Sequence, residues 1–512
     1  MRKPEHAYAA DLDLALPALD VSKVVASVTE PQERVTEATY FDTTDRRLAA
    51  ASVTVRRQTG DAGDGWRLDL PAPVEPDGRH ELRIGLGRAV RTVPRRFRTT
   101  LAGLVGDGTL TATATTTTRR TVRHLLDRDG RVLASVTDDR VDAVRIAPVG
   151  EGEQRTLVAW REVGVTLVGG RPRLLHRLGK ALTDAGARPA DPRSRLADVL
   201  DGEGHRPEGP SRPRDRTQQL IQHRVGDLVR ELRARDPLVR EGLPEGVHTM
   251  RVAIRRLRSV LATGRPFLAR DVTDPLRDEL AWLADTLGEV RDSEVRRERL
   301  DSSIDALVDE RAEVDWEADR VRSALWAPLV EEHERALAAL DEVLRSERYA
   351  RLLGQLLDLA AAPPWTERAT TRIEGAYLRR TRRELERVNQ LMEAAHDPAH
   401  TLEERALALH DARRATKRAR YAVEPLRPVY GEPAAELTTR LKTLQTALGE
   451  HQDTVVTRVY LHALVQDTHP PLDPAAALTA GALIERESRA AEEYDLQAEA
   501  AWRKVAGSPR LG

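Results

Sequence analysis

The chain has 512 residues, of which 81 are Lys or Arg and 82 are Asp or Glu, and it contains no cysteine. This length predicts roughly two to four domains, and the lack of cysteine excludes disulfides, thiolate metal sites and a cysteine nucleophile. The formal net charge of -1 argues against a generally basic nucleic-acid binder. Because neither a signal peptide nor a window of about 18 uncharged apolar residues is visible, we expect a cytoplasmic protein without a membrane span.

Residues 1–200 have the composition of a β-rich domain. Short runs alternate apolar and polar residues, as in 52–56 and 131–136, which is the pattern of half-buried strands. One helix is expected at 173–185, where leucines recur at helical spacing, and a shorter one at 194–200. We therefore predict an α+β domain built on an antiparallel β-barrel.

Residues 201–217 form the clearest boundary in the chain. Six of these 17 residues are Gly or Pro and most of the others are charged, which is the composition of a linker. Beyond it the pattern is helical almost throughout, as in 280–287, 324–345 and 434–448. Long amphipathic helices with short connections predict helical bundles, so 218–505 is expected to be an all-α domain.

The helical half contains an internal repeat. A segment beginning at His248 carries basic residues at positions +3, +7, +8 and +10, and so does a segment beginning at His410. A second motif, Leu-Gly-Glu-x-x-Asp, ends at Asp292 and again at Asp453. The two motifs recur at offsets of 162 and 161 residues. We infer duplicated four-helix bundles, with copies at about 218–345 and 370–505.

The repeated basic residues gather on one side of each predicted helix. At about 100° per residue, positions 0, +3, +7 and +10 fall within an arc of about 80°. We call the two rows the cationic stripes: His248, Arg251, Arg255, Arg256 and Arg258 in the first copy, and His410, Arg413, Lys417, Arg418 and Arg420 in the second. The opposite side of the first copy is apolar and is expected to be its core face: Met250, Ala253, Ile254 and Leu257.

Two interpretations of the stripes are open. Like charges at these spacings repel, so each stripe requires a negative partner, which could be acidic residues of neighbouring helices. Alternatively, the two stripes face each other and form a groove for an extended polyanion. Only six of the 81 basic residues are lysine; a GC-rich genome explains this excess of arginine, and alternatively the planar guanidinium group suits multidentate phosphate binding. The histidines could donate to phosphate oxygens and strengthen binding at lower pH.

Two further sets of residues could assist the stripes. Residues 377–387 are rich in arginine, and Arg379 and Arg383 are candidate phosphate ligands, although a basic surface helix explains them equally well. Asp292 and Asp453 could orient the Arg and His side chains, with a helix-cap or core ion-pair role as the alternative.

The composition also narrows the choice of polyanion. Recognition of nucleic acids normally requires base-reading polar groups or aromatic stacking platforms. Aromatic residues make up only 4% of the chain, and none lies within the stripes. A chain of regularly spaced charges without bases fits better. We therefore expect the partner to be inorganic polyphosphate, not a sequence-specific nucleic acid, and its binding to require no cofactor.

With these duplicated His/Arg helices, residues 218–505 resemble a CHAD domain, a helical module of two similar four-helix bundles. The resemblance implies that inorganic polyphosphate binds in the cleft between the repeats.

Residues 1–200 resemble a CYTH domain, the module that commonly precedes CHAD. The resemblance rests on the segments 39–43, 53–57, 66–68, 138–141, 160–162 and 194–196. In that family an antiparallel barrel forms a tunnel in which Arg and Lys bind a triphosphate. Glu and Asp hold divalent metal ions there, and the implied chemistry is metal-assisted phosphoanhydride hydrolysis.

The site residues of that family match poorly in this chain. The opening Glu-x-Glu-x-Lys falls at residues 3–7 and keeps only Glu5, a later lysine falls at Asp69, and a paired Glu-x-Glu keeps only Glu162. The remaining catalytic candidates are Glu5, Asp139 and Glu162, and the remaining phosphate candidates are Arg56, Arg57 and Arg119.

These losses lead us to predict an inactive triphosphatase-like barrel without a metal site. Its surviving charged residues are then barrel-lining ion pairs. The alternative is a Mg²⁺- or Mn²⁺-dependent triphosphatase or polyphosphatase, to which the helical domain delivers substrate.

Overall fold

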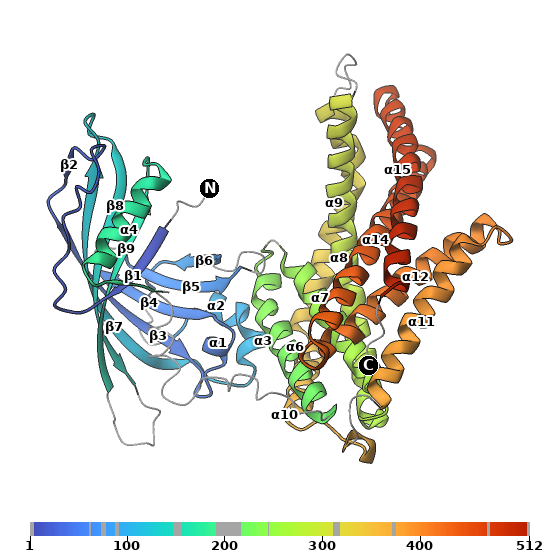
Figure 1. Cartoon of the computed structure of the whole chain (residues 1–512), viewed down its shortest axis with the longest axis horizontal. Helices are drawn as coiled ribbons and strands as arrows, with labels where there is room; N and C mark the ends of the chain where they lie inside the picture. The colour runs from blue at the N-terminus through green and yellow to red at the C-terminus, as the bar shows by residue number, and fades with distance from the viewer. Residues whose placement is uncertain are drawn as a thin grey trace. The chain divides into compact units, whose positions relative to one another are not determined.

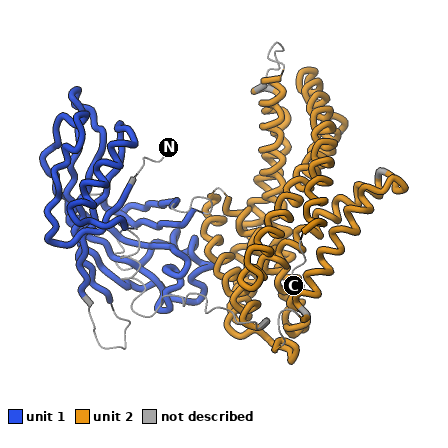
Figure 2. Tube along the Cα trace, in the orientation of Figure 1, with its two compact units in different colours: residues 1–209 blue, residues 210–512 orange. Residues whose placement is uncertain are grey.

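The chain divides into two compact units, residues 1–209 and 210–512 (Figure 2). The computed structural model describes residues 5–60, 63–72, 78–87, 92–146, 156–190, 217–243, 245–310, 318–370, 375–467 and 472–508. Of the predicted linker at 201–217, all but Thr217 lies outside the described residues, and so does the short helix predicted at 194–200.

The first unit is built on an antiparallel sheet that has ten strands among the described residues (Figure 1). The strands are β1 (Glu5–Ala10), β2 (Ser27–Val28), β3 (Gln32–Asp42), β4 (Thr54–Gly60), β5 (Gly65–Pro71), β6 (Arg79–Ile84), β7 (Thr111–Leu126), β8 (Val132–Arg145), β9 (Thr156–Leu167) and β10 (Arg188–Pro189). Their order is β10-β1-β9-β8-β7-β3-β4-β5-β6, and β2 pairs with β7. The predicted antiparallel α+β domain is confirmed, with β6 and β10 at the two ends of the strand order.

The two faces of the sheet carry different apolar clusters. One face packs against α4 (Pro172–Asp184), the helix predicted at 173–185, through residues such as Val136 and Val165. Strand side chains alternate between faces, so Val141 and Ala143 of β8 point the other way. There they join a smaller buried cluster, whose other members are Ala38, Tyr40, Ala114 and Trp160. Three short helices complete the unit: α1 (Arg47–Ala50), α2 (Arg95–Thr100) and α3 (Ala102–Val105).

The second unit is helical, as predicted. Its longer helices are α6 (Thr217–Arg240), α7 (Gly246–Thr263), α8 (Arg270–Glu310), α9 (Ala318–Arg345), α10 (Glu347–Ala361), α11 (Ala376–His396), α12 (Leu402–Val423), α14 (Glu432–Asp467) and α15 (Pro474–Ala506). Short elements are η1 (Glu367–Thr370), η2 (Glu424–Leu426) and α13 (Arg427–Tyr430). Helices α6 to α9 correspond to α11, α12, α14 and α15, because the stripes lie on α7 and α12 and the Leu-Gly-Glu-x-x-Asp motifs on α8 and α14.

The stripe helices are anchored by their apolar faces. Met250 and Ile254 of α7 are fully buried, as are the other two residues of the predicted core face, Ala253 and Leu257. On α12 the corresponding positions are the buried Ala412, Ala415 and Ala419. Burying a side chain such as Met or Ile contributes about 1.5–3 kcal/mol. The core therefore determines the direction in which each stripe points.

A buried polar contact ties α6 to α10. Asp236 is fully buried, and its carboxylate accepts hydrogen bonds from Arg240 Nε at 2.7 Å and Tyr349 Oη at 2.8 Å. Arg240 also donates to the carbonyl oxygen of Leu344 at 2.7 Å. Burial, together with the charge of Asp236, raises the pKa of Tyr349 well above its ordinary value, so its hydroxyl stays a hydrogen-bond donor.

We expect Asp236→Ala to lower the free energy of unfolding by about 3–5 kcal/mol, because it leaves Arg240 buried without its partner. Tyr349→Phe should cost about 1–2 kcal/mol. Urea unfolding followed by far-UV circular dichroism measures both. Arg345→Ala is the control, because it breaks an exposed ion pair with Asp341 that is worth under about 1 kcal/mol. A loss for Asp236→Ala no larger than that of the control would contradict this assignment.

Candidate functional site

The two cationic stripes approach each other where α7 packs against α12. The charges of Arg251 and Arg255 on α7 both act on Lys417 of α12. The charge of Arg413 on α12 acts in turn on Arg255. The +3 residue of each stripe is therefore near the +7 residue of the other. Arg258, at the end of the first stripe, is near Arg414 of α12.

Each +3 arginine is held by the aspartate of the second repeated motif. Arg251 Nη1 lies 3.1 Å from Asp292 Oδ1 and also donates to the carbonyl oxygen of Gly288 at 3.1 Å. In the second repeat, Arg413 Nη2 lies 3.7 Å from Asp453 Oδ1. An ion pair between aspartate and arginine is thus present in both repeats, which agrees with an orienting role and equally with the core ion-pair alternative.

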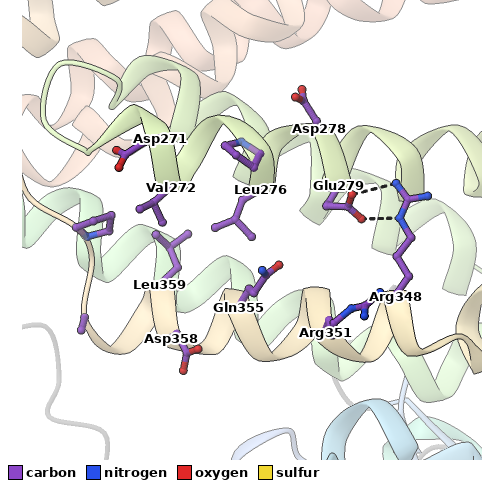
Figure 3. A pocket seen from close by; sticks show the side chains of 13 residues that line it. Asp271, Val272, Leu276, Asp278, Glu279, Arg348, Arg351, Gln355, Asp358 and Leu359 are labelled. Carbon is purple, nitrogen blue, oxygen red and sulfur yellow. Dashed lines mark hydrogen bonds and ion pairs between the residues drawn. The ribbon is translucent and has the colours of Figure 1, made fainter.

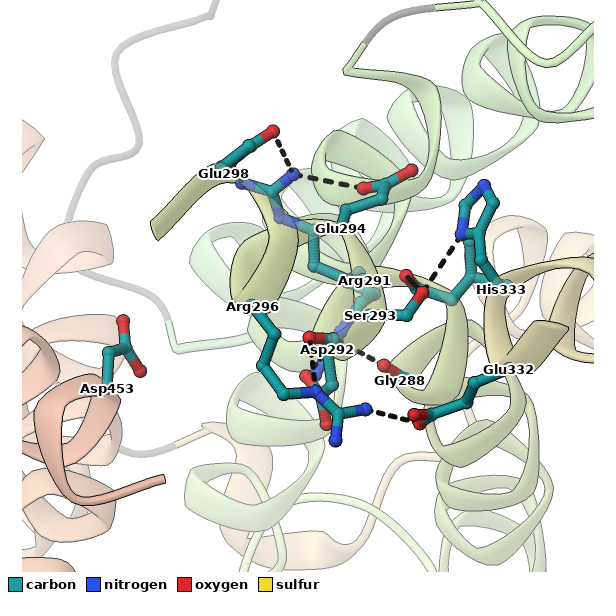
Figure 4. A network of polar contacts seen from close by, with 12 residues as sticks. Gly288, Arg291, Asp292, Ser293, Glu294, Arg296, Glu298, Glu332, His333 and Asp453 are labelled. Carbon is teal, nitrogen blue, oxygen red and sulfur yellow. Dashed lines mark hydrogen bonds and ion pairs between the residues drawn. The ribbon is translucent and has the colours of Figure 1, made fainter. Parts of the chain in front are cut away.

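Asp292 belongs to a wider polar network on α8 and α9 (Figure 4). Arg296 donates to the carbonyl oxygen of Asp292 and also pairs with Glu332 of α9. Arg291 pairs with Glu294 at 3.0 Å and Glu298 at 3.2 Å. These arginines have acidic partners close by, which restricts their motion. The network thereby orders the helix that supports Arg251.

The centre of the site has fewer such partners. Arg255 Nε is buried and donates to no acceptor, and Arg255 forms no ion pair within the described part of the chain. Burial lowers the pKa of Arg255, and the charges of Arg413 and Arg420 lower it further. Burial likewise lowers the pKa of Lys417, to about 7, with Arg413 and Arg255 adding to the effect. Burial also lowers the pKa of His248. Asp453 acts on Lys417 but already pairs with Arg413, so the cations outnumber the carboxylates where the stripes meet.

At the edge of the site, one carboxylate is shared by three arginines. Glu424, at the start of η2, lies 3.2 Å from Arg224 of α6, 3.4 Å from Arg256 and 3.3 Å from Arg420. The Arg420 guanidinium also lies 4.7 Å from the centre of the Tyr421 ring, and that of Arg256 lies 5.9 Å from it. Arg256 and Arg420 are therefore paired with an acidic residue of the protein itself, Glu424.

The remaining predicted residues lie farther out. His410 Nδ1 lies 3.1 Å from Gln452 Oε1. Arg418 is exposed and pairs with Glu384 of α11 at 3.2 Å. Arg379 and Arg383 are exposed on α11, and among the described residues neither has an ion-pair partner or a contact with the stripes.

Sequence reasoning missed Glu424, Tyr421 and Arg224. The sequence did contain a signal for the first two. Tyr421 follows Lys417 by four residues and Glu424 follows Arg420 by four, and side chains four residues apart on a helix are neighbours. Arg224 lies on α6, remote in sequence, and no pattern in the chain pointed to it.

Strand register separates the predicted residues of the sheet unit. Directly paired residues share a face. Arg56 pairs with Tyr40, and Asp139 pairs with Glu162, so all of them lie on the face that holds the Tyr40 and Trp160 cluster. The neighbouring positions Arg57 and Arg119 lie on the opposite face. Glu5 begins β1, and its side chain lies outside the described residues.

The surviving sheet residues are engaged with each other. Arg56 pairs with Asp69, and its Nη2 lies 3.7 Å from Glu81. Asp69, which stands where the CYTH family has a lysine, thus serves as a partner for Arg56. Two more pairs follow the same principle: Arg120 donates to Asp139 at 2.7 and 2.6 Å, and Arg119 to Asp142 at 3.1 Å.

Glu162, the last of the sheet candidates, accepts a hydrogen bond from the Trp160 indole at 2.9 Å. Over the portion of the chain that is described, no group of three or more His, Asp or Glu is placed to hold a metal ion.

A separate pocket of about 830 Å³ lies between α8 and α10 (Figure 3). Val272, Leu276 and Leu359 line its apolar part, and the ion pair of Glu279 with Arg348 at 2.7 Å closes one end. It contains no residue of the cationic stripes. None of the described helices is long and apolar enough to cross a bilayer.

Comparison with known proteins places these features in a family. The CHAD domain family matches residues 223–462. The helical unit contains a CHAD domain. The uncharacterized protein Rv2226 of Mycobacterium tuberculosis (strain ATCC 25618 / H37Rv) is 33% identical over 507 residues, which cover 96% of this chain and 93% of the relative. The chain belongs to the same family as that protein, and the relationship covers the sheet unit as well as the CHAD domain.

Solved structures are also similar to the CHAD unit. PptA from Streptomyces chartreusis has a TM-score of 0.47 at 21% identity and covers 56% of this chain and 99% of its own. The CHAD domain of the plant Ricinus communis has a TM-score of 0.41 at 24% identity, with 56% and 92% covered.

The depressed pKa of Lys417 predicts a pH-dependent stability. The pKa of Lys417 is about 7 in the folded protein, against an ordinary value of 10.5. Between these two pH values the unfolded chain binds more protons than the folded one, so the free energy of unfolding rises with pH. Below about pH 7 the full destabilisation by the buried charged lysine is present. Lys417→Met should therefore stabilise the ligand-free protein, by on the order of 2 kcal/mol more at about pH 6 than at about pH 9.

Chemical denaturation at the two pH values tests this prediction. Lys442→Met is the matched control, since Lys442 is exposed on α14. If Lys417→Met changed stability equally at both pH values, the lysine would not be the titrating group.

Proposed function

We propose that this protein binds inorganic polyphosphate between the cationic stripes of its CHAD domain. The observation that carries the proposal is the meeting of the two stripes around Arg255 and Lys417, where several cations lie close together and the carboxylate that acts on Lys417, Asp453, already pairs with Arg413. A bound chain of phosphates would supply the missing negative charge. The CHAD match supports this, since the notable feature of that family is a pair of His- and Arg-rich helices, which α7 and α12 resemble.

The binding mechanism is electrostatic and multidentate. Ten residues of helix span about 15 Å, so each stripe presents several guanidinium groups to consecutive phosphates of an extended chain. Arg255 can donate its orphaned Nε–H to a phosphate oxygen. Lys417 takes up a proton when a polyanion arrives, because added negative charge raises its pKa. Released counterions contribute most of the affinity, as for other polyanions.

The site geometry favours polyphosphate over nucleic acid. Base stacking requires an open aromatic face. The aromatic ring closest to the stripes, Tyr421, is contacted by the guanidinium groups of Arg420 and Arg256 and is itself buried. The groove thus offers charge but no platform for bases.

We further propose that the sheet unit is not a working triphosphatase. Asp139 is engaged by Arg120, Glu162 by Trp160 and Arg56 by Asp69. The buried Tyr40 and Trp160 cluster occupies the same face. Charged groups that neutralise each other around an apolar cluster are poorly arranged for a triphosphate and two metal ions.

Arg255→Ala and Arg413→Ala should each weaken long-chain polyphosphate binding about tenfold or more, as expected for loss of a charge-assisted contact. Each should also make the dependence of log Kd on log salt concentration less steep. Isothermal titration calorimetry of the full chain at several salt concentrations measures both. Arg212→Ala and Arg214→Ala, in the predicted linker, are the controls. Equal losses of polyphosphate affinity in the stripe and linker variants would contradict the assignment of the binding site to the stripes.

For the sheet unit, we expect no phosphate release from tripolyphosphate above background with Mg²⁺ or Mn²⁺. The measurement is a colorimetric phosphate assay with and without a chelator. Metal-dependent turnover that disappears in Glu162→Ala would establish the enzyme alternative in place of an inactive barrel.

A further inference from the structure

A second basic pocket lies apart from the stripes, in the CHAD unit. It has a volume of about 660 Å³ and is formed by the end of α7, the start of α8, η1 and the first turns of α11. Four arginines from these four segments line it, Arg265, Arg270, Arg368 and Arg380, and Glu367 is the one acidic residue in its lining.

The pocket carries an excess of positive charge. The carboxylate of Asp274 lies next to it and is shared by three guanidinium groups: Arg265 at 2.9 Å, Arg270 at 3.4 Å and Arg277 at 3.4 Å. One carboxylate balances only one of them. The excess attracts an anion with more than one charge.

Arg380 contributes a further positive charge to the lining of this pocket. Its Nε is buried and has no hydrogen-bond partner, and no ion pair of Arg380 occurs among the residues that the structure describes. A buried guanidinium N–H without an acceptor is costly, and a phosphate oxygen is the acceptor that matches its geometry best.

The walls of the pocket are held in place before any ligand binds. The Ala269 N–H donates to the Pro364 carbonyl at 2.8 Å, and the Thr366 N–H donates to the Phe267 carbonyl at 2.9 Å. The Thr366 hydroxyl donates to the carbonyl of Pro266 at 2.8 Å. These bonds join the α7–α8 corner to the segment before η1. An anion would therefore bind without the cost of ordering the loops.

Two lines of contacts connect the pocket to the stripes. On α11, Glu384 lies one turn, about 5.4 Å along the axis, after Arg380, and it pairs with Arg418 of the second stripe. On the other side, Arg277, which pairs with Asp274, is close enough to Arg258 of the first stripe to lower its pKa, after the larger effect of burial. The pocket is thus linked to both stripes through neighbouring residues, which include the acidic Glu384 and Asp274.

We propose that this pocket is a second phosphate subsite, which takes a phosphate group of the same polyphosphate chain beyond the stripes. The inference rests on the proposed function of the stripes. A second subsite would make the protein prefer polyphosphate chains long enough to reach from the stripes to the pocket, because a chain bound at the stripes is present at a high effective concentration near the pocket.

The test compares chain lengths in the full-length protein by isothermal titration calorimetry. Arg380→Gln should leave the affinity for tripolyphosphate unchanged and lower that for long-chain polyphosphate about fivefold, the effect of roughly 1 kcal/mol. Arg387→Gln, an exposed arginine on the same helix, should change neither. A thermal melt shows whether Arg380→Gln impairs folding. If it does, Arg270→Gln, at an exposed position of the pocket, is tested for the same loss of affinity for long chains.

The outcomes separate the two proposals. If the wild-type protein binds no polyphosphate, the proposed function fails. If it binds but both pocket variants keep full affinity for long chains, the second subsite fails. Pyrophosphate binding that is lost in Arg380→Gln, with unchanged long-chain affinity, would also overturn the proposal, since the pocket would then serve a free phosphate.

Discussion

The repulsion between two rows of positive charge on α7 and α12 is the constraint around which the CHAD unit is built. Each helix is held by its buried face, with Ile254 on α7 and Ala415 on α12 fully buried, so neither can rotate to move its row of charges away from the other. The core thus forces like charges together, and the surrounding side chains must limit the resulting cost.

Acidic residues reduce this charge repulsion at the edges of the site, whereas at its centre most of the repulsion remains. Asp292 and Asp453 hold the +3 arginines, and Glu424 gathers Arg256 and Arg420. Around Arg255 and Lys417 the described residues provide no comparable partner. Uncompensated buried charge destabilises a ligand-free protein, and a polyanion that binds only the folded state restores that stability. Ligand binding and folding stability are therefore linked through the same few side chains.

Much of this arrangement could be anticipated from local periodicity. Helical spacing alone placed Met250 and Ile254 in the core and the stripe residues opposite them, and the repeated offset paired Arg251 with Asp292 by analogy with Arg413 and Asp453. The Glu424 cluster could not be anticipated in full, because it joins α6 to the end of α12 across about 200 residues of chain. In the sheet unit, only the strand register shows that Arg57 and Arg119 face away from Asp139 and Glu162.

The amino-acid sequence by itself determined that two matched rows of His, Arg and Lys lie on one side of two helices, because that depends only on residue spacing and the helical repeat. It also determined that most of the CYTH family's charged positions are lost. Only the tertiary structure decided which cations are neutralised and which are not. A carboxylate such as Glu424 or Asp69 neutralises the basic side chains that the packing of the chain places within a few ångströms of it. Packing likewise placed the orphaned Arg380 beside Arg265 and Arg270, which no local pattern connects.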